Sequence, residues 1–377
     1  MKIAINCSIC QPKGGGITEY IVNLTRYLEE IDHENEYILY VLQDLYEFCL
    51  IQLPSRFKIK KIPYENNLKS IIKRSLFSQH FWYREEKIEQ FDLFHSPFFY
   101  APKFKKAKLL ITVHDLRLYR FPSTYGFLRY IYLRHSVKET IKRADKIIAI
   151  SQFTKDEIID ICKVSPEKII VIWESINRER FNLKEIEEYK LPLEYNSLLN
   201  ARFLLAVGHI EPRKNYERLL ESFKLLKKDI RNKDLKLVIV GKPNNKAKNI
   251  LKKIKEISDV VYLNFISHKL LIWLYKNATL FVFPSFYEGF GFPPMEAGNL
   301  GTLSVVSNVS SIPEICGECS VYFDPFDIKD MAFQISESLY NEDLVLKKKA
   351  LIESNLSRFS WKKNAEVTLK IYQLMIR

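Results

Sequence analysis

Glycine is scarce in this chain. Eleven glycines among 377 residues amount to less than half of the usual share of about 7%. Each glycine therefore marks a position where the backbone needs one. The sequence also lacks a run of about 18 apolar residues, so it predicts no membrane-spanning helix. The first residues lack the basic start and apolar core of a signal peptide, so we expect a cytoplasmic protein.

Metal-binding and nucleotide-binding motifs are missing too. The pairs Cys7/Cys10 and Cys316/Cys319 have the spacing of zinc ligands but lie at opposite ends of the chain, so we expect buried or incidental thiols. No Asp-x-Asp triplet suited to a divalent ion is present. The absence of G-x-G-x-x-G and of G-x-x-x-x-G-K-[ST] argues against a nicotinamide cofactor and against a P-loop ATPase.

The overall composition is that of a globular protein. Hydrophobic residues make up 47% and charged residues 27%, which excludes disordered, collagen-like and coiled-coil chains. The formal net charge of +13 favours anionic partners. A nucleic-acid-binding protein is therefore one alternative, although the sequence shows no RNA- or DNA-binding motif.

Short apolar runs alternate with helix-period segments along the whole chain. Most runs are continuous Ile, Leu and Val, the pattern of strands buried on both faces of a parallel sheet. Between them, segments such as 215–230 carry one apolar stripe at helical spacing. The alternation predicts an α/β fold. The expected strands are Lys2–Ile9, Tyr37–Leu42, Leu109–Val113, Lys146–Ile150, Lys168–Ile172, Phe203–Val207, Lys236–Val240, Val260–Leu263 and Leu280–Phe283.

The chain length suggests two domains, at roughly 150 residues each. A polar connector at 191–197 separates the two series of strands. We predict two doubly wound, Rossmann-like domains facing across a cleft: 1–190 on the acceptor side and 200–360 on the nucleotide side. Residues 361–377 form a last helix with no strand after it, which we expect to pack back toward the N-terminal domain.

Seven of the eleven glycines lie in two clusters that follow strands. Ligands of parallel α/β sheets bind beyond the carboxyl ends of strands, where glycine lets backbone N–H groups approach them. The cluster Gly14–Gly16 follows the first strand and precedes a helix-period segment. By itself, a triple glycine fits a flexible turn equally well.

The second cluster carries two glutamates. Strand Leu280–Phe283 leads into a glycine-rich loop with Glu288, and the paired prolines after it suit the first turn of a helix, which would place Glu296 in that turn. Glu296 could simply favour the helix N-terminus, with Glu288 exposed. Two carboxylates would equally suit the acid and the nucleophile of a glycosidase, but their loop-then-helix placement favours ligand holding.

Cations and histidines follow other strands. Arg213 and Lys214 come after strand 203–207 and could clamp a diphosphate, although a solvated basic turn would look the same. His114 follows strand 109–113, where it could contact a substrate or merely complete a turn. His95 has a similar position with less support.

Together, these stretches resemble glycosyltransferases of family 4, the retaining group with the GT-B fold. Glu288-x7-Glu296 around Gly-Phe-Gly is similar to that family's paired-glutamate signature. The subgroup it most resembles transfers mannose, rhamnose or related sugars in cell-surface polysaccharide or lipopolysaccharide synthesis. The other similar stretches are Gly14–Gly16, Thr112–Leu116, Ala149–Thr154, Val207–Asn215, Ser307–Glu314 and Phe323–Asp327.

The resemblance implies a role for each site residue. Glu296 would hold the ribose of a nucleotide-sugar donor, and Glu288 and His114 would contact its sugar. The family's arginine, five positions before the lysine, is here His209, so Arg213 is expected to substitute for it. The remaining implied contacts are the amides of Gly289, Phe290 and Gly291 with the sugar, and Arg213, Lys214, Gly15 and Gly16 with the diphosphate.

The implied reaction is a retaining, metal-independent hexosyl transfer without a cofactor. Fixed cations would stabilise the charge that develops on the leaving diphosphate, and that phosphate would take the acceptor's proton. Three alternatives share the architecture or the motifs: a nucleotide-sugar epimerase, a phosphorylase, and an inactive polysaccharide-binding homologue.

A basic, aromatic stretch points to the acceptor. Residues 56–108 hold 13 Lys and Arg against five acidic residues. We hypothesise that this face rests on the cytoplasmic side of an anionic membrane and admits a lipid-linked acceptor; a core helix with a solvated basic face is the alternative. The residues concerned are Leu68, Lys69, Ile71, Ile72, Lys73, Arg74, Leu76, Phe77, Phe81, Trp82 and Tyr83.

Overall fold

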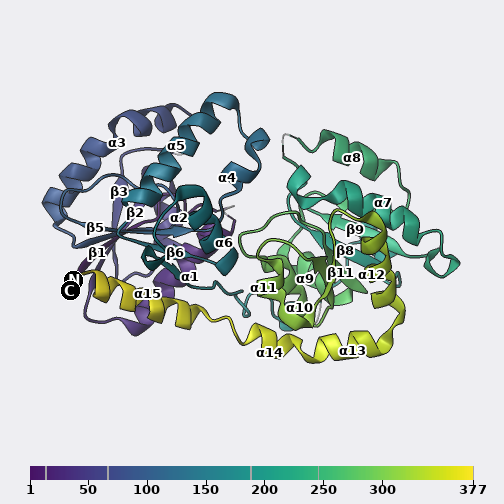
Figure 1. The fold of residues 1–377 in the computed structure, drawn as a ribbon. Coiled ribbons are helices and arrows are strands. Elements are labelled where there is room, and N and C mark those ends of the chain that lie inside the picture. The colour runs from purple at the N-terminus through teal and green to yellow at the C-terminus, as the bar shows by residue number, and fades with distance from the viewer. Residues whose placement is uncertain (13–14, 66–67, 187–188, 245, 377) are drawn as a thin grey trace. The chain divides into compact units, whose positions relative to one another are not determined.

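The computed structural model describes residues 1–377 except 13–14, 66–67, 187–188, 245 and 377, and it describes no side chain for 68–77, 123, 128 and 185 (Figure 1). The chain divides into two compact units. The first combines 1–174 with 360–377, and the second comprises 175–359. The break thus precedes the connector at 191–197, because Phe181 and Leu198 pack into the core of the second unit.

The first unit is built on a parallel sheet with the strand order β3-β2-β1-β4-β5-β6-β7. Alternate residues of each strand point to opposite faces, so the sheet feeds two apolar cores. Ala4 and Ile38 face a core shared with α3 and α5, whereas Ile3 and Leu39 face one shared with α1 and α15. The strands are β1 Lys2–Asn6, β2 Glu36–Leu42, β3 Lys58–Ile62, β4 Leu93–Ser96, β5 Lys108–Val113, β6 Lys146–Ala149 and β7 Ile169–Val171.

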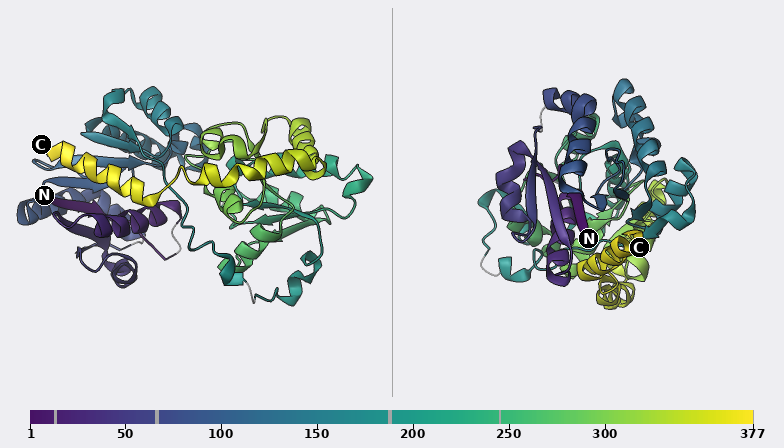
Figure 2. Two further views of the ribbon diagram at one scale, coloured as in Figure 1. Left: turned by 90° about the horizontal axis from the view of Figure 1, so that it is seen from below. Right: turned by 90° about the vertical axis from the view of Figure 1, so that its left-hand side faces the viewer.

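The chain's last helix completes this first unit. α15 packs against α1, and both chain ends lie on this unit (Figures 1 and 2). Trp361 and Tyr372 of α15 are buried in its core. The helices of the unit are α1 Gly16–Ile31, α2 Tyr46–Gln52, α3 Leu68–Glu89, α4 Arg117–Arg120, α5 Phe127–Arg143, α6 Gln152–Glu157 and α15 Trp361–Ile376.

The second unit repeats the plan with the parallel strand order β10-β9-β8-β11-β12-β13. One face packs on α7, α8 and α12, and the other on α9, α10 and α11. The strands are β8 Phe203–Val207, β9 Lys236–Val240, β10 Val260–Leu263, β11 Leu280–Phe283, β12 Ser304–Ser307 and β13 Val321–Phe323. The helices are α7 Tyr216–Leu226, α8 Lys248–Lys255, α9 His268–Asn277, α10 Phe292–Asn299, α11 Ile312–Cys316, α12 Ile328–Tyr340, α13 Glu342–Ala350 and α14 Ile352–Leu356.

The strand orders confirm the predicted α/β fold with two doubly wound sheets. In each order the sequence of strands reverses once, beside β1 and β4 in the first sheet and beside β8 and β11 in the second. Ligands of such sheets bind at this reversal, beyond the carboxyl ends of the strands. The cations after β8 and the glutamate loop after β11 therefore lie on neighbouring strands at the expected place.

Candidate functional site

Two glycines shape the carboxyl edge of the second sheet, where β8 and β9 end side by side. A Cβ atom added to Gly241 would lie 1.8 Å from the carbonyl oxygen of Gly208. The Tyr216 hydroxyl donates a hydrogen bond to that same oxygen at 2.9 Å. The stem of Lys214 also lies against Gly208, with Cε 3.2 Å from the position of an added Cβ. The edge is therefore packed backbone to backbone, and Lys214 rests on it.

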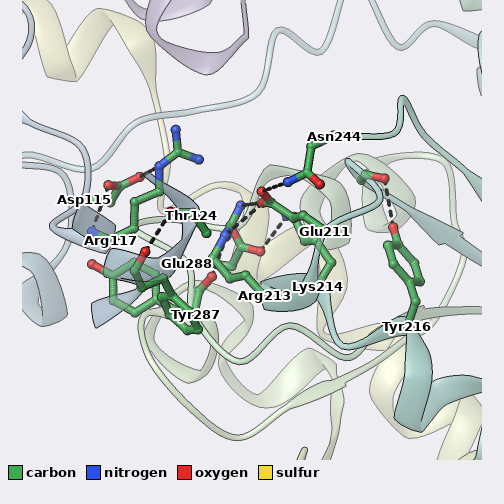
Figure 3. Close-up of polar contacts among 12 residues, drawn as sticks. Asp115, Arg117, Thr124, Glu211, Arg213, Lys214, Tyr216, Asn244, Tyr287 and Glu288 are labelled. Carbon is green, nitrogen blue, oxygen red and sulfur yellow. Dashed lines mark hydrogen bonds and ion pairs between the residues drawn. The ribbon is translucent and has the colours of Figure 1, made fainter. Parts of the chain in front are cut away.

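Arg213, Lys214 and Glu288 form a buried ion-pair cluster at this edge (Figure 3). The Lys214 Nζ donates to Glu288 Oε1 at 2.6 Å, and the Arg213 Nη1 donates to Glu288 Oε2 at 2.8 Å. The three side chains are only 10–12% exposed. The structure thus brings three of the residues singled out in the sequence into direct contact.

Glu211 and Asn244 extend this cluster, and neither is conspicuous in the sequence. Glu211 Oε1 accepts from Nε and Nη2 of Arg213 at 3.0 and 2.7 Å. Glu211 Oε2 accepts from the Asn244 side chain at 3.2 Å (Figure 3). The cluster of Glu211, Arg213, Lys214 and Glu288 is therefore electrically balanced, with two cations and two carboxylates.

Burial and neighbouring charge act in opposite directions on this cluster. Burial would raise the pKa of Glu288, but the charges of Arg213 and Lys214 outweigh it and lower this pKa to about 2. Burial lowers the pKa of Lys214, and the charge of Glu288 offsets part of that effect. Glu288 is thus a carboxylate at any physiological pH.

Serines fix the loop that carries Glu288. The backbone N–H of Glu288 donates to Ser310 Oγ at 3.1 Å. The hydroxyl of Ser311 bonds the carbonyl oxygens of Glu288 and Phe290 at 2.9 and 2.7 Å. Both serines belong to the stretch 307–314, which the family resemblance covers without assigning them a role. They hold the glutamate loop in a defined conformation.

The glycine-rich loop then enters α10. Gly289, Phe290 and Gly291 are buried, and Gly291 precedes the helix with φ of +127°, a conformation that favours glycine. The paired prolines predicted that Glu296 lies in the first turn of α10. It is the fifth residue of that helix and so lies just beyond the first turn. Its Oε2 accepts from the buried Tyr275 hydroxyl at 2.7 Å.

In the first unit, His114 is engaged through both ring nitrogens. Its Nδ1 lies 2.9 Å from Glu174 Oε1, and its Nε2 lies 2.8 Å from the carbonyl oxygen of Pro97. Burial would lower the pKa of His114, but Glu174 and the Pro97 carbonyl outweigh it and raise this pKa. The acceptors at both nitrogens and the buried Glu174 thus favour the protonated form of His114.

His95 lies in β4, which pairs with β5, the strand that leads to His114. It is fully buried and contacts Tyr372 Oη and Thr112 Oγ1 at 2.7 and 2.9 Å. Burial lowers its pKa to about 3, so it is neutral. His95 therefore belongs to the packing of α15.

Gly15 and Gly16 form the start of α1, directly after the loop that follows β1. The carbonyl oxygen of Gly15 accepts the first helical hydrogen bonds. Gly14 lies outside the described residues. The helix N-terminus is thus at the carboxyl edge of the first sheet, where it suits an anion.

The proposed membrane face lies on α3, and most of its side chains (68–77) are outside the described residues. The last part of that helix packs inward: Trp82 is buried against Tyr40 and Phe94, with ring centroids 4.9 and 5.0 Å apart. None of the described helices combines the length and the apolar character needed to cross a membrane.

The six cysteines are buried thiols. Within the described ranges, no three side chains of His, Cys, Asp or Glu form a group that could hold a metal ion.

Comparisons with known proteins identify both halves of the chain. Residues 14–180 match the model "Glycosyltransferase Family 4", and residues 193–358 match the model "Glycosyl transferases group 1". O-antigen chain mannosyltransferase B of Escherichia coli is 28% identical over 75% of this chain and 74% of its own length. The serotype-specific mannosyltransferase WbdA of E. coli is 28% identical over 63% of this chain, which spans 29% of that longer protein.

A solved structure shows the same fold. The Anabaena protein HepE, in complex with UDP and glucose, superposes with a TM-score of 0.75 at 14% identity over 99% of both chains. Together with the two family models, this agreement establishes the GT-B architecture. The chain belongs to the GT-B glycosyltransferases, with a family 4 N-terminal half and a group 1 C-terminal half.

Proposed function

We propose that the protein transfers mannose or a related hexose from a nucleoside diphosphate sugar to a saccharide or lipid-linked acceptor in surface polysaccharide synthesis. The named activity of the E. coli relative supports the sugar, and the UDP and glucose in the HepE structure support the donor class. The observation that carries the proposal is the buried Lys214–Glu288 pair at the reversal of the second sheet.

In this proposal Lys214 meets the donor diphosphate. The bond between the anomeric carbon and the phosphate oxygen breaks, and both of its electrons go to that oxygen. A fixed ammonium nearby stabilises this charge as it develops. The acceptor oxygen bonds to the carbon on the face that the diphosphate leaves, which retains the configuration, and its proton passes to the leaving phosphate.

The other site residues take supporting roles in the proposal. Glu288 and the amides of the loop 289–291 hold the sugar, and Glu296 holds the ribose. The acceptors that face both ring nitrogens of His114, Glu174 and Pro97, favour its positively charged form. It therefore acts by its charge and shape, and cannot serve as a base while it is protonated. We propose no metal, because Lys214 supplies the positive charge that a divalent ion would otherwise bring.

A thermal-shift screen against GDP-, UDP-, dTDP- and ADP-sugars, with and without EDTA, tests the donor. The correct nucleotide sugar stabilises the protein by mass action. Donor turnover is assayed in the same two buffers. Turnover that continues in EDTA supports metal independence, and loss of turnover in EDTA refutes it. Donor consumption that needs no acceptor would instead indicate an epimerase. Stabilisation by none of the four would contradict the proposed donor class.

We also propose that the basic segment 56–108 brings the enzyme to the anionic cytoplasmic face of the membrane that carries its acceptor. Its support is the charge of this segment, 13 Lys and Arg against five acidic residues. Flotation with anionic liposomes tests it. Binding should fall with salt and in the variant Lys69, Lys73 and Arg74→Glu; binding that neither change affects would refute it.

A further inference from the structure

Arg213 contacts three consecutive residues of the loop that carries Glu288. Its carbonyl oxygen accepts from the Phe286 N–H at 2.9 Å. Its Nη1 donates to the carbonyl oxygen of Tyr287 at 2.5 Å and to Glu288 Oε2 at 2.8 Å. A single residue after β8 thus fixes both the backbone and the side chain of the loop after β11.

The other side of the guanidinium is held as firmly. Nε and Nη2 both donate to Glu211 Oε1, and Asn244 holds the second oxygen of Glu211. Four hydrogen bonds therefore direct the Arg213 fork toward protein acceptors. The fork is fixed between two carboxylates, a geometry that lysine cannot reproduce.

Lys214 differs from Arg213 in what holds it. The described hydrogen bond and ion pair of its ammonium go to Glu288, and Nζ also lies 4.9 Å from the centre of the Phe283 ring. An ammonium is a point charge on a flexible stem. A diphosphate that approaches the cluster can take Lys214 from Glu288, whereas Arg213 would have to leave Glu211, Tyr287 and Glu288 together.

We infer that Arg213 is a positioning residue: held by Glu211, it fixes Glu288 and its loop. Of Arg213 and Lys214, only Lys214 meets the diphosphate. This inference rests on the proposed function and changes the role that the family resemblance gives to Arg213. Groups held by a second layer of hydrogen bonds keep the geometry that catalysis requires.

A matched pair of charge-removing variants tests the inference. The probe is whichever of UDP, GDP, dTDP and ADP stabilises the wild type most. Lys214→Gln should weaken its binding at least about tenfold, because a charged hydrogen bond is lost. Arg213→Gln should change its binding by less than about threefold but lower kcat for the sugar donor about 100-fold, because Glu288 is misplaced.

A rescue experiment separates position from charge. Arg213→Lys restores the charge without the fork, so we expect kcat to stay low. Arg231→Gln, which removes an exposed two-donor contact to Asp229 in the same unit, is the control and should keep wild-type kinetics. Full rescue by lysine, or equal loss of nucleotide binding in Arg213→Gln and Lys214→Gln, would overturn the inference.

Two further measurements keep the test decisive. If Arg213→Gln does not fold, Glu211→Gln is the second variant. It keeps Arg213 but removes the charge of the carboxylate that holds it, and it should lower kcat without weakening nucleotide binding. Titration of the Glu288 carboxyl by 13C NMR needs no ligand, and its pKa of about 2 should rise in Arg213→Gln. An unchanged pKa would refute the contact even if the proposed donor proves wrong.

Discussion

Gly241→Ala is the substitution for which the structure predicts the largest effect from the smallest change. The new methyl group would lie 1.8 Å from the Gly208 carbonyl oxygen, where side-chain carbons essentially never come closer than 3.0 Å. The obstacle is backbone, and β8 and β9 are paired along their whole length. The backbone must therefore shift by about 1 Å, at a cost of about 1–3 kcal/mol, as overpacked cores show.

The shift should reach the site directly. Gly208 supports the stem of Lys214, and its carbonyl oxygen holds Tyr216. A displacement of about 1 Å at a catalytic group costs about 100-fold in rate. We expect Gly241→Ala to lower the Tm by about 2–4 °C per kcal/mol in a unit of this size, with a kcat about two orders of magnitude lower.

Calorimetry and donor turnover check this prediction, with Gly126→Ala as the control. An added Cβ at Gly126 meets nothing within 4 Å, so this variant should behave as the wild type. Wild-type Tm and kcat in Gly241→Ala would show that the two strand ends are not packed backbone to backbone.

Three further predictions concern single groups. Because the pKa of His114 is raised in the folded protein, its pair with Glu174 stabilises the fold fully below about pH 6.5. This stabilisation is lost as the pH rises through the folded pKa. Glu174→Gln should abolish that decline in a series of Tm measurements from pH 6 to 9. Because the folded pKa of Glu288 is about 2, against an ordinary 4.5, its stabilisation is complete above about pH 4.5 and is lost as pH falls toward 2. Glu288→Gln should remove this acid dependence in urea unfolding and cost about 3 kcal/mol near neutral pH, because the buried Lys214 loses its ion-pair partner and Arg213 loses one of its two. Tyr275→Phe removes the hydrogen bond to Glu296, and should raise the donor KM several-fold without changing kcat. An unchanged KM would show that this hydrogen bond does not position Glu296 for donor binding.

The sequence predicts the elements that are continuously apolar. Strands such as β8, β9 and β11 are buried on both faces, so their pattern is plain, and all three have the predicted bounds. β3 is an edge strand that reads KIKKI, with exposed lysines that break the apolar run. β4 contains His95, whose polar ring is satisfied by Tyr372 from the other end of the chain, and no local pattern reveals such a partner.

The residues of the candidate site likewise differ in whether the sequence could predict them. Arg213, Lys214 and Glu288 could be found because each follows a strand, and parallel strands end at one edge. Glu211 could have been suspected from its place two residues before Arg213. Glu174 could not, because its importance comes from contact with His114, 60 residues earlier in the chain.

The first unit is built from two separate segments of the chain, 1–174 and 360–377, and this has a consequence for biosynthesis. Its core needs Trp361 and Tyr372, which the ribosome adds only after the whole of the second unit. The nascent N-terminal half therefore waits, with the face formed by Ile3, Ile5 and Tyr20 uncovered, while all of 175–359 is translated. Such a wait exposes apolar surface to aggregation. A stop codon shortly before residue 360 would leave the second unit intact and the first one permanently unfinished.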